Sequence, residues 1–266
     1  MECKICSENN CLEAFVKNVT KCTNCLSLYN MSALHEEIPV IASINNNLKL
    51  SVQKRVSKLI AQSYLAYLKK KTKLDFKNAL DIGCGFGDFV VELNKIGIKA
   101  SGIESNVNTV KNAKSNVNYG LFGESYDSTI KYDLISINQA LYYFEDSFAI
   151  IKKISSLLEV NGIILIATVN TESSFRQKHK IWTQGCKICL GNKIWKNFDK
   201  FGLKCMDVTS YDDGLYIDFF LHKADLMSNT KFLKNMLLYL SLMKKAIVVK
   251  EDGIDNFVLL QKVRYV

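Results

Sequence analysis

The residues best suited to chemistry follow a short apolar run near residue 80. The run 79–82 leads into three alternating glycines, Gly83, Gly85 and Gly87. A strand that ends in such a turn lets the backbone approach a ligand where a Cβ atom would clash. The next apolar run ends at Glu104, at a spacing where an acidic side chain can accept both hydroxyls of a ribose. The stretch therefore predicts a pocket for a nucleotide cofactor.

The glycine pattern distinguishes two kinds of cofactor. A dinucleotide fingerprint reads G-x-G-x-x-G, but here the residue at its last glycine is Asp88 or Val90, depending on the starting glycine. The pattern that remains is D-x-G-x-G-x-G. It resembles the first motif of the class I S-adenosylmethionine (SAM) dependent methyltransferases, with Asp81 as its first residue. Glu104 and the adjoining Ser105 then stand in the place of the ribose-binding acid of that family.

The resemblance implies roles for further residues in cofactor binding. Asp81 is expected near the methionine amino group, where its charge offsets the ammonium. Glu124 or Ser125 is the expected neighbour of adenine. Asn138, at the end of a later apolar run, is expected near the methionine moiety and the methyl group. For Glu124 and Asn138 the alternative is an ordinary helix cap.

Two pairs of cysteines near the amino terminus have the spacing of metal ligands. Cys3-x-x-Cys6 and Cys22-x-x-Cys25 are separated by fifteen residues, as in two knuckles that close on one tetrahedral zinc. Because protein thiolates would fill all four positions, the predicted role is structural. The alternative is four incidental reduced cysteines. A third pair, Cys186-x-x-Cys189, lacks a partner pair and is predicted to be two unligated thiols.

Apolar and amphipathic stretches alternate through the chain. Strands are predicted at 79–82, 99–103, 119–122, 132–137 and 162–169, with helices over 52–70, 88–96 and 108–114. This alternation requires a parallel sheet with helices on both faces. Two later strands, at 204–208 and 256–263, are expected to pair antiparallel. The predicted fold is α/β: a Rossmann-like, seven-stranded methyltransferase sheet with helices on both faces, plus a small N-terminal zinc ribbon.

The composition limits the number of domains and the compartment. The chain has 266 residues, 48% hydrophobic and 23% charged, which is ordinary for one globular domain with a small appendage. We expect a zinc module and linker over 1–42 and a methyltransferase domain over 43–266, with a helical insertion near 218–249. No signal core or apolar run of ~18 residues is visible. A cytoplasmic protein with reduced cysteines is therefore expected.

The net charge of +9 suggests an anionic partner. Nine Lys or Arg residues lie in 49–77, where an apolar stripe at helical spacing favours a solvated helix face. Seven more lie in 175–203, against Asp199 alone. This second segment follows the last predicted parallel strand, where open α/β sheets place residues that face the ligand crevice. Within it, Arg176, Lys178 and His179 are expected to face the acceptor.

Methyl transfer requires alignment of the acceptor with the sulfonium and, for a hydroxyl acceptor, removal of one proton. Many small-molecule members of the family carry Glu-His after the fourth strand, but here Tyr142 and Tyr143 stand at those places. The N-P-P-[YF] tetrad of enzymes that methylate amino groups of nucleic-acid bases is also missing. His179 is therefore the first candidate for the general base. Tyr142 and Tyr143 come next, although stacking in the pocket is their more ordinary role.

The pairing of a four-cysteine module with this domain resembles bacterial sugar and surface-glycan methyltransferases. The chain lacks the Tyr/Ser-rich motif that follows the knuckles in the C-methylating members, so O-methylation is favoured. The expected acceptor is small and anionic, such as a phosphorylated or nucleotide-linked sugar or another capsule or lipopolysaccharide precursor. A zinc-ribbon RNA methyltransferase is the first alternative, although no aromatic-basic interleaving marks a stacking platform. A non-catalytic SAM-binding interaction module is the second, and the intact glycines speak against it.

Overall fold

The computed structural model describes residues 2–3, 5–30, 50–114, 116–123, 125–183, 185–213 and 247–264. The strands are β1 (Cys11–Glu13), β2 (Val19–Cys22), β3 (Leu28–Asn30), β4 (Asn78–Ile82), β5 (Lys99–Glu104), β6 (Val117–Tyr119), β7 (Tyr132–Asn138), β8 (Leu158–Val169), β9 (Ile188–Cys189), β10 (Leu203–Asp213), β11 (Ile247–Val249) and β12 (Asp255–Lys262). The helices are α1 (Leu50–Lys71), α2 (Asp88–Lys95), α3 (Val107–Lys111), α4 (Ser147–Leu157) and α5 (Ser174–His179), with short 3-10 helices η2 (Leu141–Tyr143) and η3 (Asn192–Phe201).

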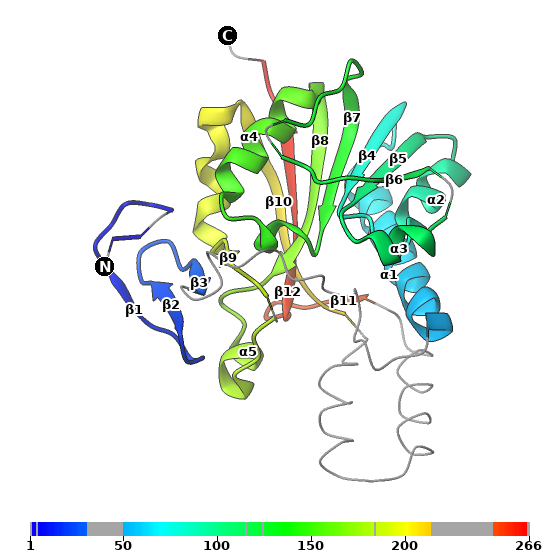
Figure 1. The fold of residues 1–266 in the computed structure, drawn as a ribbon. Helices are drawn as coiled ribbons and strands as arrows, with labels where there is room; N and C mark the ends of the chain where they lie inside the picture. The colour runs from blue at the N-terminus through cyan, green and yellow to red at the C-terminus, as the bar shows by residue number, and fades with distance from the viewer. Residues whose placement is uncertain are drawn as a thin grey trace, which may run out of the picture.

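These strands form two sheets (Figure 1). The larger has the order β11-β10-β12-β8-β7-β4-β5-β6. Its strands β8, β7, β4, β5 and β6 run parallel, whereas β12 is antiparallel to β8 and β10 is antiparallel to β12. The predicted α/β fold and its antiparallel pair are therefore confirmed. The three-residue edge strand β11 adds an eighth strand to the seven expected.

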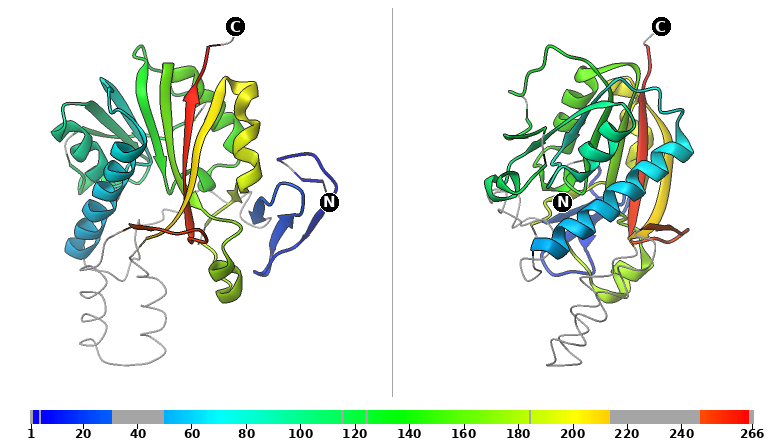
Figure 2. Two further views of the ribbon diagram at one scale, coloured as in Figure 1. Left: turned by 180° about the vertical axis from the view of Figure 1, so that it is seen from behind. Right: turned by 90° about the vertical axis from the view of Figure 1, so that its right-hand side faces the viewer.

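Helices cover both faces of the larger sheet, as Figure 2 shows from two further sides. Strand β7 illustrates the division. Leu134 belongs to a buried cluster with α1 and α2, whereas Ile135 and Ile137 belong to a second cluster with α4 and η3. Burial on both faces explains why the central strands appear in the sequence as nearly continuous apolar runs.

Strand β6 differs from its predicted range of 119–122. It spans Val117–Tyr119 and pairs with the end of β5. The chain then leaves the sheet: Leu121 is exposed, and Phe122 is buried with its ring 5.0 Å from that of Tyr126. The apolar residues after β6 therefore serve packing at the edge of the sheet.

The smaller sheet combines segments that lie far apart in the sequence. It has the order β1-β2-β3-β9, and β9 comes from the segment after α5. Figures 1 and 2 both show this sheet beside η3. The predicted boundary near residue 42 and residues 218–246 of the predicted insertion lie outside the described residues, while 247–249 form β11. Among the helices of the described ranges, none has both the length and the apolar character of a bilayer span.

Candidate functional site

The glycine turn after β4 has the left-handed backbone that favours glycine. Gly83, Gly85 and Gly87 have φ angles of 68°, 57° and 75°. A Cβ atom on Gly83 would lie 2.7 Å from the Cβ of Ala140, and one on Gly87 would lie 2.4 Å from a methyl carbon of Val117. A Cβ atom on Gly85 would meet nothing within 4 Å. Packing within the protein therefore requires the outer two glycines, and the open side of Gly85 is available to a ligand.

Glu104 lies at the end of β5 and faces this turn. Its Oε2 accepts the backbone N–H of Gly85 at 2.9 Å, and its Oε1 accepts the backbone N–H of Asn106 at 2.8 Å. Each carboxylate oxygen keeps a lone pair for a further donor. Ser105 is exposed beside it. The carboxylate is thus fixed at the open glycine, in a position suited to the hydroxyls of a ribose.

Asp81 is buried at the end of β4. The Ser136 hydroxyl donates to its Oδ1 at 2.6 Å. Burial raises the pKa of Asp81 to about 7; the Ser136 hydrogen bond opposes this rise and the charge of Glu104 adds to it. A cation beside Asp81 would favour the ionised carboxylate. The site therefore suits an ammonium group.

Asn138 ends β7 and completes this part of the site. Its side-chain nitrogen and oxygen are both buried and have no hydrogen-bond partner within the described part of the chain. Burying an unpaired polar group costs about 1–3 kcal/mol, so a ligand that pairs with this amide would recover that cost. Because β5, β4 and β7 are parallel neighbours, Glu104, Asp81 and Asn138 lie along one edge of the sheet. These residues fit a cofactor with a ribose and an amino acid moiety.

A buried polar network, which no local sequence pattern indicates, lies directly beside Asn138. Gln139 has a φ of 53°. Its Nε2 donates to Asp255 Oδ2 at 2.9 Å and to Tyr211 Oη at 3.1 Å, and the Tyr142 hydroxyl donates to its Oε1 at 3.0 Å. The partners come from β12, β10 and η2. Gln139 therefore joins three elements at the carboxyl edge of the sheet.

Arg176 belongs to the same network, so the expectation that it faces the acceptor is wrong. Its Nη2 donates to Asp255 Oδ1 at 2.7 Å, and its Nε donates to the carbonyl oxygen of Ile254 at 2.6 Å. Burial raises the pKa of Asp255, and the guanidinium opposes that rise. A buried charge of this kind needs such a partner, which explains why Arg176 points into the protein.

The three candidate bases differ in their surroundings. Tyr142 is buried, and its hydroxyl donates a hydrogen bond to Gln139. Burial raises the pKa of Tyr142 well above the usual value. Tyr143 is half-buried, with its ring centroid 4.6 Å from that of Tyr142 in an edge-on contact. His179 is exposed at the end of α5, with its ring 4.4 Å from that of Phe175. His179 therefore has the access to solvent that an incoming acceptor needs.

The predicted adenine contacts lie beyond β6. Ser125 is exposed in the segment that follows this strand. Glu124 lies outside the described residues. Strand β6 pairs with β5, whose last residue is Glu104. The segment after β6 thus leaves the sheet on the ribose side of the site.

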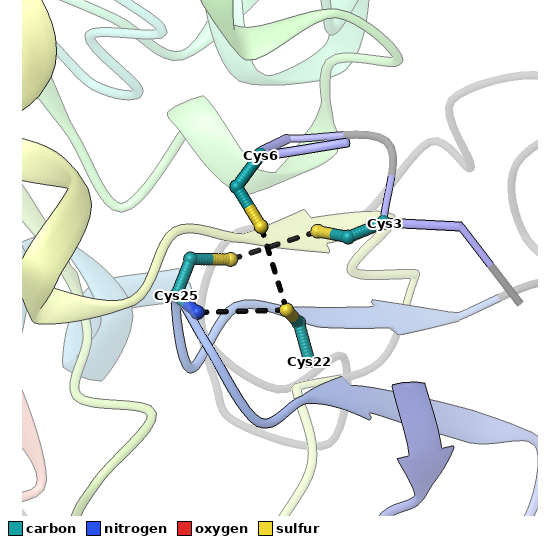
Figure 3. A group of neighbouring side chains, drawn as sticks. All are labelled: Cys3, Cys6, Cys22 and Cys25. Atoms are coloured by element: carbon teal, nitrogen blue, oxygen red, sulfur yellow. Dashed lines mark hydrogen bonds between the residues drawn. The ribbon is translucent and has the colours of Figure 1, made fainter. Parts of the chain in front are cut away.

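The four amino-terminal cysteines converge, as Figure 3 shows. Their sulfur atoms all lie within 4.8 Å of one another. Two of the distances, from Cys3 Sγ to Cys25 Sγ and from Cys6 Sγ to Cys22 Sγ, are 3.6 Å. Four sulfurs at the Zn–S bond length around a tetrahedral ion would be about 3.8 Å apart. The arrangement therefore fits a single thiolate-bound ion.

The two cysteine pairs have the same turn. The backbone N–H of Ser7 donates to the carbonyl oxygen of Cys3 at 2.8 Å, and that of Leu26 donates to that of Cys22 at 3.0 Å. Ser7 and Leu26 have φ angles of 59° and 64°. This repetition is expected of two knuckles that present ligands to one ion. Cys11 lies outside the four-cysteine cluster.

The third cysteine pair forms no such cluster. Cys186 and Cys189 are buried free thiols with sulfur atoms 3.0 Å apart. No group of three or more metal-ligating side chains includes them among the described residues. The two thiols form a buried pair, and the absence of a second metal there stays a prediction.

The fold and the cofactor edge define a class I SAM-dependent methyltransferase. Residues 52–196, more than half of the chain, match the family described as a methyltransferase domain. The protein belongs to that family and is a SAM-dependent methyltransferase. No curated protein matches the chain.

Solved structures from several organisms have a similar fold. A SAM-dependent methyltransferase from Thermotoga maritima has 16% identity and a TM-score of 0.53, over 78% of this chain and 91% of that one. A structure from Galdieria sulphuraria, described as a sarcosine dimethylglycine methyltransferase, has 15% identity and a TM-score of 0.50, over 82% and 91%. A structure of the complex between the Haloferax volcanii methyltransferase activator Trm112 and a methyltransferase has 15% identity and a TM-score of 0.52, over 81% of this chain and 93% of that one. At these identities the likeness concerns the fold alone.

Removing the Glu104 carboxylate should weaken SAM binding. We expect Glu104→Ala to lose about 1.5–3 kcal/mol, because charge-assisted hydrogen bonds to the ribose disappear. Isothermal titration calorimetry measures the change. Glu159→Ala is the control, since Glu159 is exposed near the amino end of β8, the opposite edge of the sheet. Equal SAM affinity in both variants would remove Glu104 from the cofactor site.

SAM affinity should depend on the ionisation of Asp81. The pKa of about 7 leaves this group largely protonated in mildly acidic solution. If the ammonium of SAM binds beside it, binding releases a proton, and affinity rises as the pH increases from about 6 to about 8. Calorimetry in two buffers of different ionisation enthalpy counts that proton. Asp81→Asn should abolish the release, and an unchanged count in this variant would place the ammonium elsewhere.

Proposed function

We propose that this methyltransferase O-methylates a small anionic acceptor, such as a phosphorylated or nucleotide-linked sugar or another capsule or lipopolysaccharide precursor. The supporting observation is the end of α5, where Lys178, His179 and Lys180 are all exposed. This helix follows β8, where that strand reaches the carboxyl edge of the sheet. Strand β8 is the neighbour of β7, which ends at Asn138. Cations at that edge attract an anionic acceptor toward the cofactor.

When bound, SAM supplies an electrophilic methyl group on its sulfonium. In our proposal Asp81 holds the amino end of the cofactor and Glu104 its ribose, while the amide of Asn138 orients the methionine moiety. Ser105, Glu124 and Ser125 stay proposed neighbours of the ribose and adenine. Alignment of this kind supplies most of what an in-line displacement needs.

His179 is the proposed general base for the acceptor hydroxyl. Imidazole is the side chain most often used as a general base, and this one is accessible at the end of α5. Tyr143 is the second candidate. Tyr142 is the weakest of the three, because its hydroxyl is buried and already donates to Gln139.

An RNA acceptor is the alternative, and one feature favours it. Helix α1 exposes five basic residues, Arg55, Lys58, Lys69, Lys70 and Lys71. Basic side chains of this kind could contact phosphates. A solvated helix surface explains the same residues, so the small acceptor is preferred. The non-catalytic alternative is set aside, because the chain belongs to an enzyme family.

Labelled SAM should distinguish the two acceptors. We expect label in sugar nucleotides and phosphorylated glycan precursors, and none in total RNA. His179→Ala should lower turnover by about 10²–10⁴-fold with unchanged SAM affinity. In the control, Lys178→Ala should mainly raise KM, since it removes charge but no base. Label in RNA would establish the alternative, whereas full turnover in His179→Ala would move the base to Tyr143 or another group.

We also propose that Cys3, Cys6, Cys22 and Cys25 hold a structural zinc ion. Backbone N–H groups of Ile5 and Cys25 lie 3.4 and 3.5 Å from the sulfurs of Cys3 and Cys22, where they stabilise thiolates. The module has too little chain to build a large apolar core of its own.

The nine free cysteines suit a reducing compartment, so we place the protein in the cytoplasm.

Elemental analysis should find one zinc ion per chain. Cys22→Ser should release the ion, because three thiolates close a tetrahedral site poorly. Cys11→Ser is the matched control: Cys11 pairs with Cys22 in the β1–β2 register but lies outside the cluster. Full metal retention in Cys22→Ser would contradict the ligand assignment.

A further inference from the structure

A single short segment connects the zinc module with the acceptor side of the active site. Strand β9 pairs with β3, with Leu28 opposite Cys189 and Tyr29 opposite Ile188. Just before β9, the carbonyl oxygen of Lys187 accepts the N–H of Asn30 at 3.0 Å. The N–H of Lys187 donates in turn to the carbonyl oxygen of Tyr142 at 2.7 Å. The same residue therefore touches the zinc module and η2.

The end of this segment packs against the second cysteine knuckle. A Cβ atom on Gly191 would lie 2.0 Å from the carbonyl oxygen of Cys25. The N–H of Gly191 donates to the buried hydroxyl of Ser27 at 3.0 Å. That hydroxyl also lies 3.3 Å from Cys25 Sγ. The position of Gly191 therefore depends on the shape that Cys25 and Ser27 give to the knuckle.

From η2, the series of contacts continues to the carboxyl edge of the sheet at Asn138. Tyr142 donates to Gln139, and Gln139 donates to Asp255, which is paired with Arg176. Gln139 directly follows Asn138, the residue with the unpaired buried amide. Each link is a hydrogen bond or ion pair between buried or half-buried groups, so a shift of η2 would disturb the residues next to the methyl group.

We propose that the zinc knuckle positions the acceptor side of the active site, with Ser27 and Gly191 as positioning residues. Metal binding fixes the second knuckle, the knuckle fixes β9, and β9 fixes η2 and the network around Gln139. The inference rests on the proposed zinc site. Binding of the ribose should be independent of it, because the glycine turn after β4 and Glu104 at the end of β5 have their own hydrogen bonds.

Hydrogen exchange on the full chain tests this coupling without knowledge of the acceptor. The zinc-loaded protein is compared with protein treated with a chelator. Loss of the metal should speed exchange in peptides covering 138–145 and 185–191 by about tenfold, the effect of losing one buried hydrogen bond. Peptides covering 79–90 should not change. Faster exchange confined to 2–30 would overturn the inference.

Two variants separate the contact from the metal. Gly191→Ala and Ser27→Ala both leave the four cysteines in place, and both should bind one zinc ion. Both should nevertheless speed exchange at 138–145, with the larger effect in Gly191→Ala. Gly123→Ala is the control for exchange at 138–145, since a Cβ atom there meets nothing within 4 Å and its backbone is not left-handed.

The outcomes distinguish this inference from the zinc proposal. If Gly191→Ala loses its metal, Ser27→Ala decides, and unchanged exchange at 138–145 in a zinc-loaded Ser27→Ala protein overturns the coupling. If elemental analysis finds no zinc in the purified wild-type protein, the zinc site itself is overturned.

Discussion

The parallel register of β5, β4 and β7 is the constraint on which the active site depends. Parallel neighbours end at the same edge of a sheet, so the side chains that close these strands meet there. Glu104 and Asn138 are the last residues of β5 and β7, and Asp81 is the last but one of β4. The glycine turn then has only to leave the space between them open to a ligand. Packing against Ala140 and Val117 enforces that shape from within the protein.

The same edge carries an unusual number of buried polar groups. Asp81 and Asp255 are buried carboxyls, Asn138 has an unpaired amide within the described chain, and Gln139 adopts a left-handed backbone. Buried polar side chains cost free energy that apolar ones would not, and a left-handed backbone costs any residue other than glycine a further amount. The groups around Gln139 offset that cost among themselves through hydrogen bonds. Asp81 and Asn138 are offset only in part, which is the expected condition of residues that await a ligand.

The amino-terminal module is integrated with the catalytic sheet in its packing. Cys3, Cys22 and Cys25 of the four-cysteine group belong to the same buried cluster as Trp195 of η3 and Ile135 and Ile137 of β7. Strand β9 completes the small sheet. A structural ion at this place would therefore stabilise other parts of the protein as well as its own segment of about thirty residues. It would also stabilise β9, whose neighbour Lys187 contacts η2.

The sequence alone determined the features that depend on near neighbours in the chain. The glycine turn, the C-x-x-C pairs and the buried parallel strands each follow from local spacing and periodicity, so the fold and the cofactor edge could be predicted. It could not show that Arg176 faces inward, because its partner Asp255 is 79 residues away. Nor could it show that β9 joins the zinc module, since Leu28 and Cys189 share no local pattern. These contacts were decided by tertiary structure, where burial of a charge or of a strand edge requires a partner, whatever its distance along the chain.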